Sequence, residues 1–387
     1  MRISIRQQLS VYLLVATLWS LLPFCSGAGF FITNGSLTWY PPARPLKKEI
    51  ESLVTENTKN DGVYSILSQS NVIDPNTGKA CLALDDSTLG KSPPFPFMQR
   101  KSNYRKALVV VMPQLGDSDS FEYAEVLRHA MPDLEAANIA LRIIGIGNAK
   151  SAQMFSLYTG IPLENLRVDP TGSIHQKLDL HRGPNWDVPS WLPQEALEWF
   201  AENVCANDNE KIPAKEVVRA WMNYAAMSAG IASQGTIREI LRGFFGDKSA
   251  PERIHPEETI RAGPITVKGT SDFQVGPIKY RNFWNQQEGC LRPLELASVR
   301  LRSMMEVLTK FDHYVPDQRF LDWRGATFLL DENSCEKNGR PLYKHHDQGP
   351  FGYSESMSRP LSFLSNYIGM ERARNPIGLK DPEFLYD

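Results

Sequence analysis

The sequence predicts an α/β fold in which a central sheet is flanked by helices and interrupted by a long helical insert. An apolar run at 107–112 is typical of a buried parallel strand, and helical periodicity follows over 121–134. A second strand at 140–146 and a second helix at 148–158 repeat the alternation. Strands that alternate with helices in this way predict a sheet covered by helices.

The second half of the predicted core lies far along the chain. A short strand and a helix at 173–178 end the first half. The core then resumes as a hairpin with strands at 327–331 and 342–346 and a turn region at 333–339. A final helix is predicted over 354–367.

Between 183 and 322 the alternation of strands and helices stops. This segment is too long for a structureless loop, so it predicts a helical subdomain. Helical stretches are expected at 194–205, 214–230, 236–245, 257–261 and 293–311. Trp186, Trp191, Trp199 and Trp221 are interpreted as the core of this insert, with a pigment, quinone or partner surface as the alternative.

The turn at 113–123 joins the first core strand to its helix. Such a turn points backbone N–H groups and the helix dipole at one spot. Asp119 and Glu122 have the spacing of a capping box, which predicts a helix cap. The alternative is an aspartyl-phosphate phosphotransferase, in which Asp117 is the nucleophile and Asp119 the general acid around Mg²⁺.

An ordered set of motifs surrounds this turn. Gly145-Ile146-Gly147, Phe155-x-x-x-Thr159-Gly160 and Val168-Asp169-Pro170 are followed by 325–331 and 339–347. Together with the turn, they resemble the peroxiredoxin-like branch of the AhpC/TSA antioxidant group within the thioredoxin superfamily. The resemblance covers roughly residues 105–182 and 320–368, and it implies a thioredoxin-like fold.

The resemblance also implies where redox cysteines would lie. Aligning the Cys-x-x-Cys pattern of that branch on Glu122-Tyr123 puts its cysteines at Asp117 and Ser120, and the Pro-x-x-x-Thr-x-x-Cys pattern also ends at Ser120. A serine hydroxyl has no thiolate and no sulfenic acid state, so it cannot enter the cysteine oxidation cycle.

The resulting expectation is a thioredoxin-fold protein without cysteine-based peroxidase activity, which acts in binding or assembly with a protein partner. No cofactor and no metal are expected. One alternative is an antioxidant thiol oxidoreductase that uses displaced cysteines such as Cys205 and Cys290. The other is the Mg²⁺-dependent phosphatase that would use Asp117 and Asp119.

The first residues predict targeting. Arg2 and Arg6 precede an apolar stretch at 9–24 and small residues at 26–29, which is the pattern of a cleaved signal peptide. The competing interpretation is a membrane anchor, but the stretch is shorter than the ~20 apolar residues that span a bilayer. We therefore expect no membrane span in the mature chain.

The residues after the signal peptide are basic and hydroxylated, and no acidic residue occurs from 30 to 48. This composition is typical of a transit peptide. A signal peptide followed by Phe30 and a transit segment resembles the bipartite leader of algae with secondary plastids. We therefore expect a plastid (chloroplast) location. The alternative is secretion, with Asn34 as a potential glycosylation site.

Composition adds limits on partners and cysteines. The 42 basic and 44 acidic residues give a net charge of −2, so there is no electrostatic case for nucleic-acid binding. Cys81, Cys205, Cys290 and Cys335 lie beyond the leader, and three pairings of them remain open. A plastid location favours free thiols, whereas secretion favours disulfides.

These patterns divide the chain into seven parts. They are a signal peptide (1–29), a transit segment (30–48), an N-terminal helix and loop extension (49–104), the first half of the thioredoxin-like core (105–182), a helical insert (183–322), the second half of the core (323–369) and a mobile tail (370–387).

Overall fold

The computed structural model divides the chain into two compact units, Met1–Asp61 and Gly62–Asp387. In the first unit it describes the antiparallel pair β1 (Phe31–Thr33) and β2 (Ser36–Thr38). In the second unit, the structure describes residues 62–85, 106–180, 182–203, 205, 212–228, 293–335, 339–347, 352–355 and 359–374, except for a few side chains. It describes the strands at 259–262, 265–268, 273–275 and 278–280 by their backbone alone.

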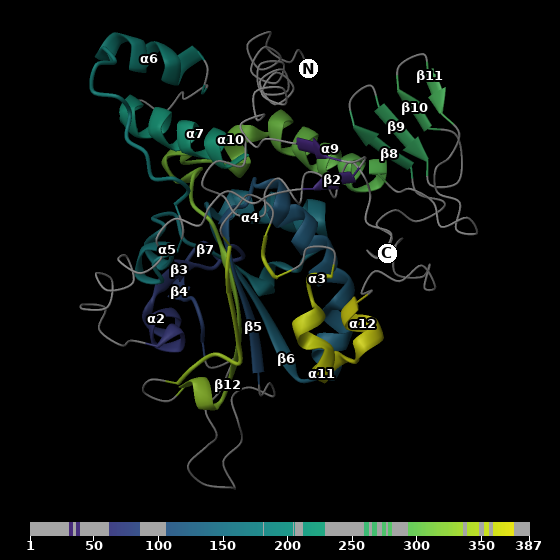
Figure 1. Ribbon diagram of the computed structural model, residues 1–387. Helices are drawn as coiled ribbons and strands as arrows, with labels where there is room; N and C mark the ends of the chain where they lie inside the picture. The colour runs from purple at the N-terminus through teal and green to yellow at the C-terminus, as the bar shows by residue number, and fades with distance from the viewer. Residues whose placement is uncertain are drawn as a thin grey trace, which may run out of the picture. The chain divides into compact units, whose positions relative to one another are not determined.

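A mixed seven-stranded sheet forms the centre of the second unit, in the order β13-β12-β5-β6-β7-β3-β4 (Figure 1). Strands β5, β6 and β7 are parallel, whereas β12 is antiparallel to β5 and β13 to β12. The strands are β3 (Asn71–Ile73), β4 (Ala80–Leu82), β5 (Lys106–Gln114), β6 (Ile139–Ile146), β7 (Leu166–Val168), β12 (Ala326–Asp331) and β13 (Tyr343–His346). With helices on both faces, this sheet has the α/β, thioredoxin-like architecture that the sequence predicts.

Helices cover both faces of this sheet. The helices that the structure describes in this unit are α2 (Val63–Gln69), α3 (Ser118–Ala136), α4 (Ala149–Thr159), α5 (Ser173–Lys177), α6 (Gln194–Asn203), α7 (Ala214–Ser228), α9 (Pro293–Thr309), α10 (Phe311–Tyr314), α11 (Ser365–Ile368) and α12 (Met370–Arg374). Short 3₁₀ turns occur at Leu163–Asn165, Gln318–Phe320, Asn333–Cys335 and Ser362–Leu364.

Strand β5 shows why the sheet is covered on both sides. Its side chains alternate between two hydrophobic clusters, because successive residues of a strand point to opposite faces. Leu108, Val110 and Met112 pack with α3 and α4, whereas Val109 and Val111 pack with α2 and α5. A strand buried on both faces reads as a continuous apolar run, which is what the sequence has at 107–112.

Helix α3 is fixed to its neighbours at its first turn. The Phe121 ring contacts the rings of Phe155 and Tyr314, with centroids 5.2 and 5.4 Å away. The Glu122 carboxylate accepts a hydrogen bond of 3.1 Å from Arg300 Nε on α9. The first turn of α3 is therefore attached both to the core and to a helix that follows much later in the sequence.

Helix α4 begins where the sequence places it. Asn148 is the N-cap: its side chain accepts a hydrogen bond from the Ser151 N–H, and Ser151 Oγ accepts one from the Asn148 N–H. This reciprocal pair is a capping box, and it starts the helix that the sequence predicts at 148–158.

Three expectations about secondary structure are wrong. Strand β4 lies within 49–104, which the sequence predicts as a helix and loop extension without strands. In the insert, β8 (Thr259–Ala262) replaces the helix expected at 257–261. It belongs to a four-stranded antiparallel sheet with β9 (Ile265–Lys268), β10 (Phe273–Val275) and β11 (Ile278–Tyr280), so the insert is not wholly helical. β-Branched residues are frequent in β8 and β9, and such residues favour strands over helices.

The predicted final helix is shorter and begins later than expected. Gly352–Glu355 is not helical, and helix begins only with the 3₁₀ turn at Ser362–Leu364. Gly369, with φ +84°, separates α11 from α12, because this left-handed backbone interrupts a right-handed helix. Helix α12 occupies the start of the segment predicted as a mobile tail, and the rest of that segment lies outside the described residues.

The tryptophans of the insert do not form one core. Trp186, Trp191 and Trp199 are 45%, 77% and 57% exposed, so their interpretation as core residues is wrong. Trp221 packs beside Cys205 and donates a hydrogen bond to Gln318. In the part of the chain that the structure describes, no helix combines the length and apolar character needed to cross a membrane.

Candidate functional site

The turn from β5 to α3 places acidic side chains at the start of the helix, but they do not form the predicted capping box. Asp117 is the N-cap residue, and its side chain makes no capping hydrogen bond. Asp119 is already the second residue of the helix, and Glu122 is bound to Arg300. The prediction of Asp119 and Glu122 as helix cap is therefore wrong, because arginines from distant segments take their carboxylates.

Arg324 is the residue on which these carboxylates converge. Its side chain is fully buried, and Nη2 lies 2.7 Å from Asp117 Oδ2, 2.9 Å from Asp119 Oδ2 and 3.2 Å from Asp347 Oδ2. We call these four residues the Arg324 cluster. The cluster joins three segments: the start of α3, the segment just before β12, and the segment just after β13.

The charges of the Arg324 cluster do not cancel if all three carboxylates are ionised. Burial opposes the charge of Arg324, but the carboxylates outweigh burial and raise its pKa above the usual value. Burial and the neighbouring Asp117 raise the pKa of Asp119 well above its usual range. Both causes favour the protonated form of Asp119, because a neutral carboxyl leaves the cluster with less buried charge.

Ser120 is tied to a second buried group. Its hydroxyl shares a hydrogen bond of 2.9 Å with the hydroxyl of Tyr353. The Tyr353 ring stacks on Tyr123, with centroids 5.0 Å apart and planes 6° apart. Burial, with the nearby Asp119 and Asp117, raises the pKa of Tyr353. The hydroxyl of Ser120 is therefore held by a neutral phenol, with no base in contact that the structure describes.

Gly325 explains how Arg324 comes so close to α3. A Cβ at this position would lie 2.3 Å from the carbonyl oxygen of Val111 and 2.7 Å from the Tyr353 ring. Only glycine lets the backbone of this segment pack directly against β5. The Gly325 carbonyl also accepts a hydrogen bond of 2.9 Å from the Asp347 N–H, which sets the place of Asp347.

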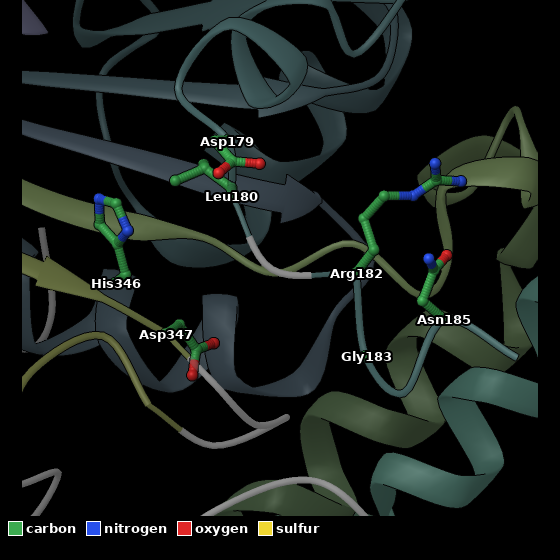
Figure 2. Close-up of a pocket in the computed structure, with 7 residues that line it drawn as sticks. All are labelled: Asp179, Leu180, Arg182, Gly183, Asn185, His346 and Asp347. Atoms are coloured by element: carbon green, nitrogen blue, oxygen red, sulfur yellow. The ribbon is translucent and has the colours of Figure 1, made fainter. Parts of the chain in front are cut away.

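A pocket of about 450 Å³ opens beside the Arg324 cluster (Figure 2). One wall comes from the loop after α5, and the other from the end of β13. The lining residues are Asp179, Leu180, Arg182, Gly183, Asn185, His346 and Asp347. Asp347 therefore belongs to both features, because its carboxylate contacts Arg324 and its side chain borders the pocket.

Of the two displaced thiols, the structure describes Cys205 and leaves Cys290 outside the described residues. Cys205 is a free, buried cysteine packed with Ile212 and Val217. Burial raises the pKa of its thiol to about 12, so almost none of it is thiolate at neutral pH. Cys81 is also free, and burial raises its pKa.

The phosphatase alternative meets a different obstacle. Asp117 and Asp119 both bind a guanidinium group, which occupies the place where a cation would bridge them. Among the described residues, no three His, Cys, Asp or Glu side chains are arranged to hold a metal ion.

Residues 126–249 match the model of the AhpC/TSA antioxidant enzyme family. The chain is therefore peroxiredoxin-like over this region, which agrees with the resemblance and with the thioredoxin-like sheet. The match begins inside α3, after Asp117 and Ser120, so the assignment of these two residues to redox positions stays a prediction. It runs past 182 into the predicted insert, whose boundaries no comparison tests. No curated protein and no solved structure compared with the chain matches it.

The sequence patterns do not point to Arg324 or Tyr353, nor to Asp347 as a residue that both binds Arg324 and lines the pocket. The signal for Arg324 is weak: a charged residue that only Gly325 separates from a mostly apolar strand. Burying an unpaired charge at the end of a strand costs free energy, so a buried arginine there indicates an acidic partner elsewhere in the chain. Asp117 and Asp119 are that partner, but nothing local links positions some 205 residues apart.

The pKa shift of Asp119 leads to a test by pH. In the unfolded chain this carboxyl ionises near pH ~4, whereas in the folded chain it keeps its proton to higher pH. The folded state then binds more protons, so the contribution of Asp119 to stability is present below about pH 4 and is lost as pH rises, at up to ~1.4 kcal/mol per pH unit. We expect Asp119→Asn, which mimics the protonated acid, to become progressively more stable than the wild type from pH 5 to pH 8 in urea unfolding.

The buried histidines do not disturb this comparison. Burial lowers the pKa of His175 to about 4, but its effect is common to both proteins and cancels in the difference. Asp312→Asn, an exposed site on α10, controls for the loss of one charge. A difference between Asp119→Asn and wild type that stays constant from pH 5 to pH 8 would show that Asp119 is ionised in the fold.

Proposed function

We propose that the chain is a peroxiredoxin-like plastid protein that acts in binding or assembly and does not reduce peroxide with a cysteine. The observation that carries the proposal is the Arg324 cluster. At the start of α3, where the resemblance expects reactive cysteines, Asp117 is bound to Arg324 and Ser120 to Tyr353. These groups hold each other in place and offer no thiolate to a peroxide.

The chemistry of thiol peroxidases supports this proposal. Their first step transfers an oxygen atom from the peroxide to a thiolate, which becomes a sulfenic acid. An alcohol cannot take that step, because it has neither an accessible anion near neutral pH nor a stable oxidised form. Cys205 could supply a sulfur, but its raised pKa and apolar surroundings oppose both the thiolate and the approach of peroxide.

The peroxidase question can be tested by kinetics. We expect the purified protein, given hydrogen peroxide and a thioredoxin reducing system, to consume peroxide no faster than a variant in which all cysteines are serine. A matched pair, Cys205→Ser and Cys290→Ser, separates the two displaced thiols. Turnover that requires either cysteine would overturn the proposal and establish the antioxidant enzyme instead.

The plastid location rests on the leader alone. We expect a fluorescent fusion of residues 1–50 to enter the plastid of an alga with secondary plastids, because the signal peptide would deliver it to the endomembrane system and the acid-free segment to the organelle. Phe30→Ala should hold the fusion outside the inner envelopes, whereas Phe31→Ala is the matched control. Secretion of the intact fusion would refute the plastid location and support the secreted alternative.

A further inference from the structure

The pocket beside the Arg324 cluster has the size of a small-molecule site, since such sites are typically ~300–1,000 Å³. Its loop wall has a defined shape. Asp179 and Asn185 have φ values of 50° and 55°, in the left-handed region that Asp and Asn tolerate better than most residues. Gly183 has φ +69°, and a Cβ there would lie 2.8 Å from Met227 Sδ on α7. The loop therefore packs closely against α7 at Gly183.

The charged groups that face this pocket are mainly acidic. Asp179 and Asp347 both line it (Figure 2), and the Asp347 side chain is 1% exposed and paired with Arg324. Arg182 also lines the pocket, but its guanidinium lies over the Trp323 ring at 4.6 Å and is attracted by Asp322. In Figure 2 it extends away from both carboxylates. The guanidinium of Arg182 therefore lies over Trp323, on the side away from both carboxylates.

The remaining polar groups suit a ligand that donates hydrogen bonds. Burial lowers the pKa of His346 to about 4, so its ring is neutral at physiological pH and one nitrogen can accept. Asn185 supplies an amide oxygen. Among the lining residues, Leu180 has an apolar side chain, which is 4% exposed. A metal ion fits less well, since the described residues contain no set of three side chains placed to ligate one.

We infer that this pocket binds a small organic cation with amino groups, such as a diamine, between the Asp179 and Asp347 carboxylates. The inference deepens the binding role proposed above and rests on it. It specifies the ligand by its chemistry: two or more N–H donors, a positive charge and a short alkyl chain.

Binding at this pocket would be coupled to the Arg324 cluster through Asp347. The Asp347 carboxylate already contacts Arg324 Nη2 at 3.2 Å, the longest of the three ion pairs of that nitrogen. An ammonium group close to Asp347 would compete with Arg324 for the same charge. Arg324 would then depend more on Asp117 and Asp119, so a ligand in the pocket would change the ion pairs at the start of α3.

Isothermal titration calorimetry on the full chain tests this inference. The probe is 1,4-diaminobutane, compared with the neutral 1,4-butanediol and the anionic succinate, which have the same chain length. We expect saturable binding of the diamine only. Asp179→Asn keeps the side-chain shape and tolerates the left-handed backbone, and it should weaken binding about tenfold or more because it removes one charge-assisted contact.

Asp187→Asn is the matched control, because it removes an exposed carboxylate from the same segment outside the pocket and should leave the affinity unchanged. Equal affinity for diamine and diol, no binding of the diamine, or an unchanged affinity in Asp179→Asn would each overturn the inference. None of these results depends on peroxide consumption, so failure of the inference and failure of the proposed function remain distinguishable.

Discussion

The buried charge of Arg324 is the constraint on which the rest of the site depends. Removing a guanidinium group from water costs several kcal/mol, and only close, well-placed carboxylates offset that cost. Asp117, Asp119 and Asp347 supply them from two distant parts of the chain. The start of α3 and the β12–β13 hairpin must therefore come together in one arrangement, and that arrangement fixes the pocket wall at Asp347.

The segment that carries Arg324 is also held from the other side. Asp322 forms a buried ion pair of 2.6 Å with Arg219 on α7, and Trp221 on the same helix binds Gln318. Helix α7 thus binds the segment that precedes β12, while Gly325 allows the same segment to pack directly against β5. The insert does more than interrupt the core, because its helices α7 and α9 both attach to the elements that build the site.

The sequence predicts those parts of the fold whose signals are local. The apolar run at 107–112 predicts β5, and the helix predicted at 148–158 matches α4, because strand burial and helical periodicity act within a few residues. The Asp-rich turn has a local explanation too, the capping box, and that explanation is wrong. Asp119 and Glu122 bind Arg324 and Arg300, which lie 205 and 178 residues away. Pairing over such distances is a tertiary property, and no local pattern records it.

Arg324 is bound mainly through its charge to the carboxylates at the start of α3 and after β13. A double-mutant cycle in urea unfolding, with Arg324→Met, Asp117→Asn and the double variant, measures this directly. Arg324→Met alone should cost about 3–5 kcal/mol, because it leaves buried carboxylates without their cation. We predict a coupling free energy between the two positions of about 2 kcal/mol or more. Additive effects, or an Arg324→Met variant as stable as the wild type, would contradict it.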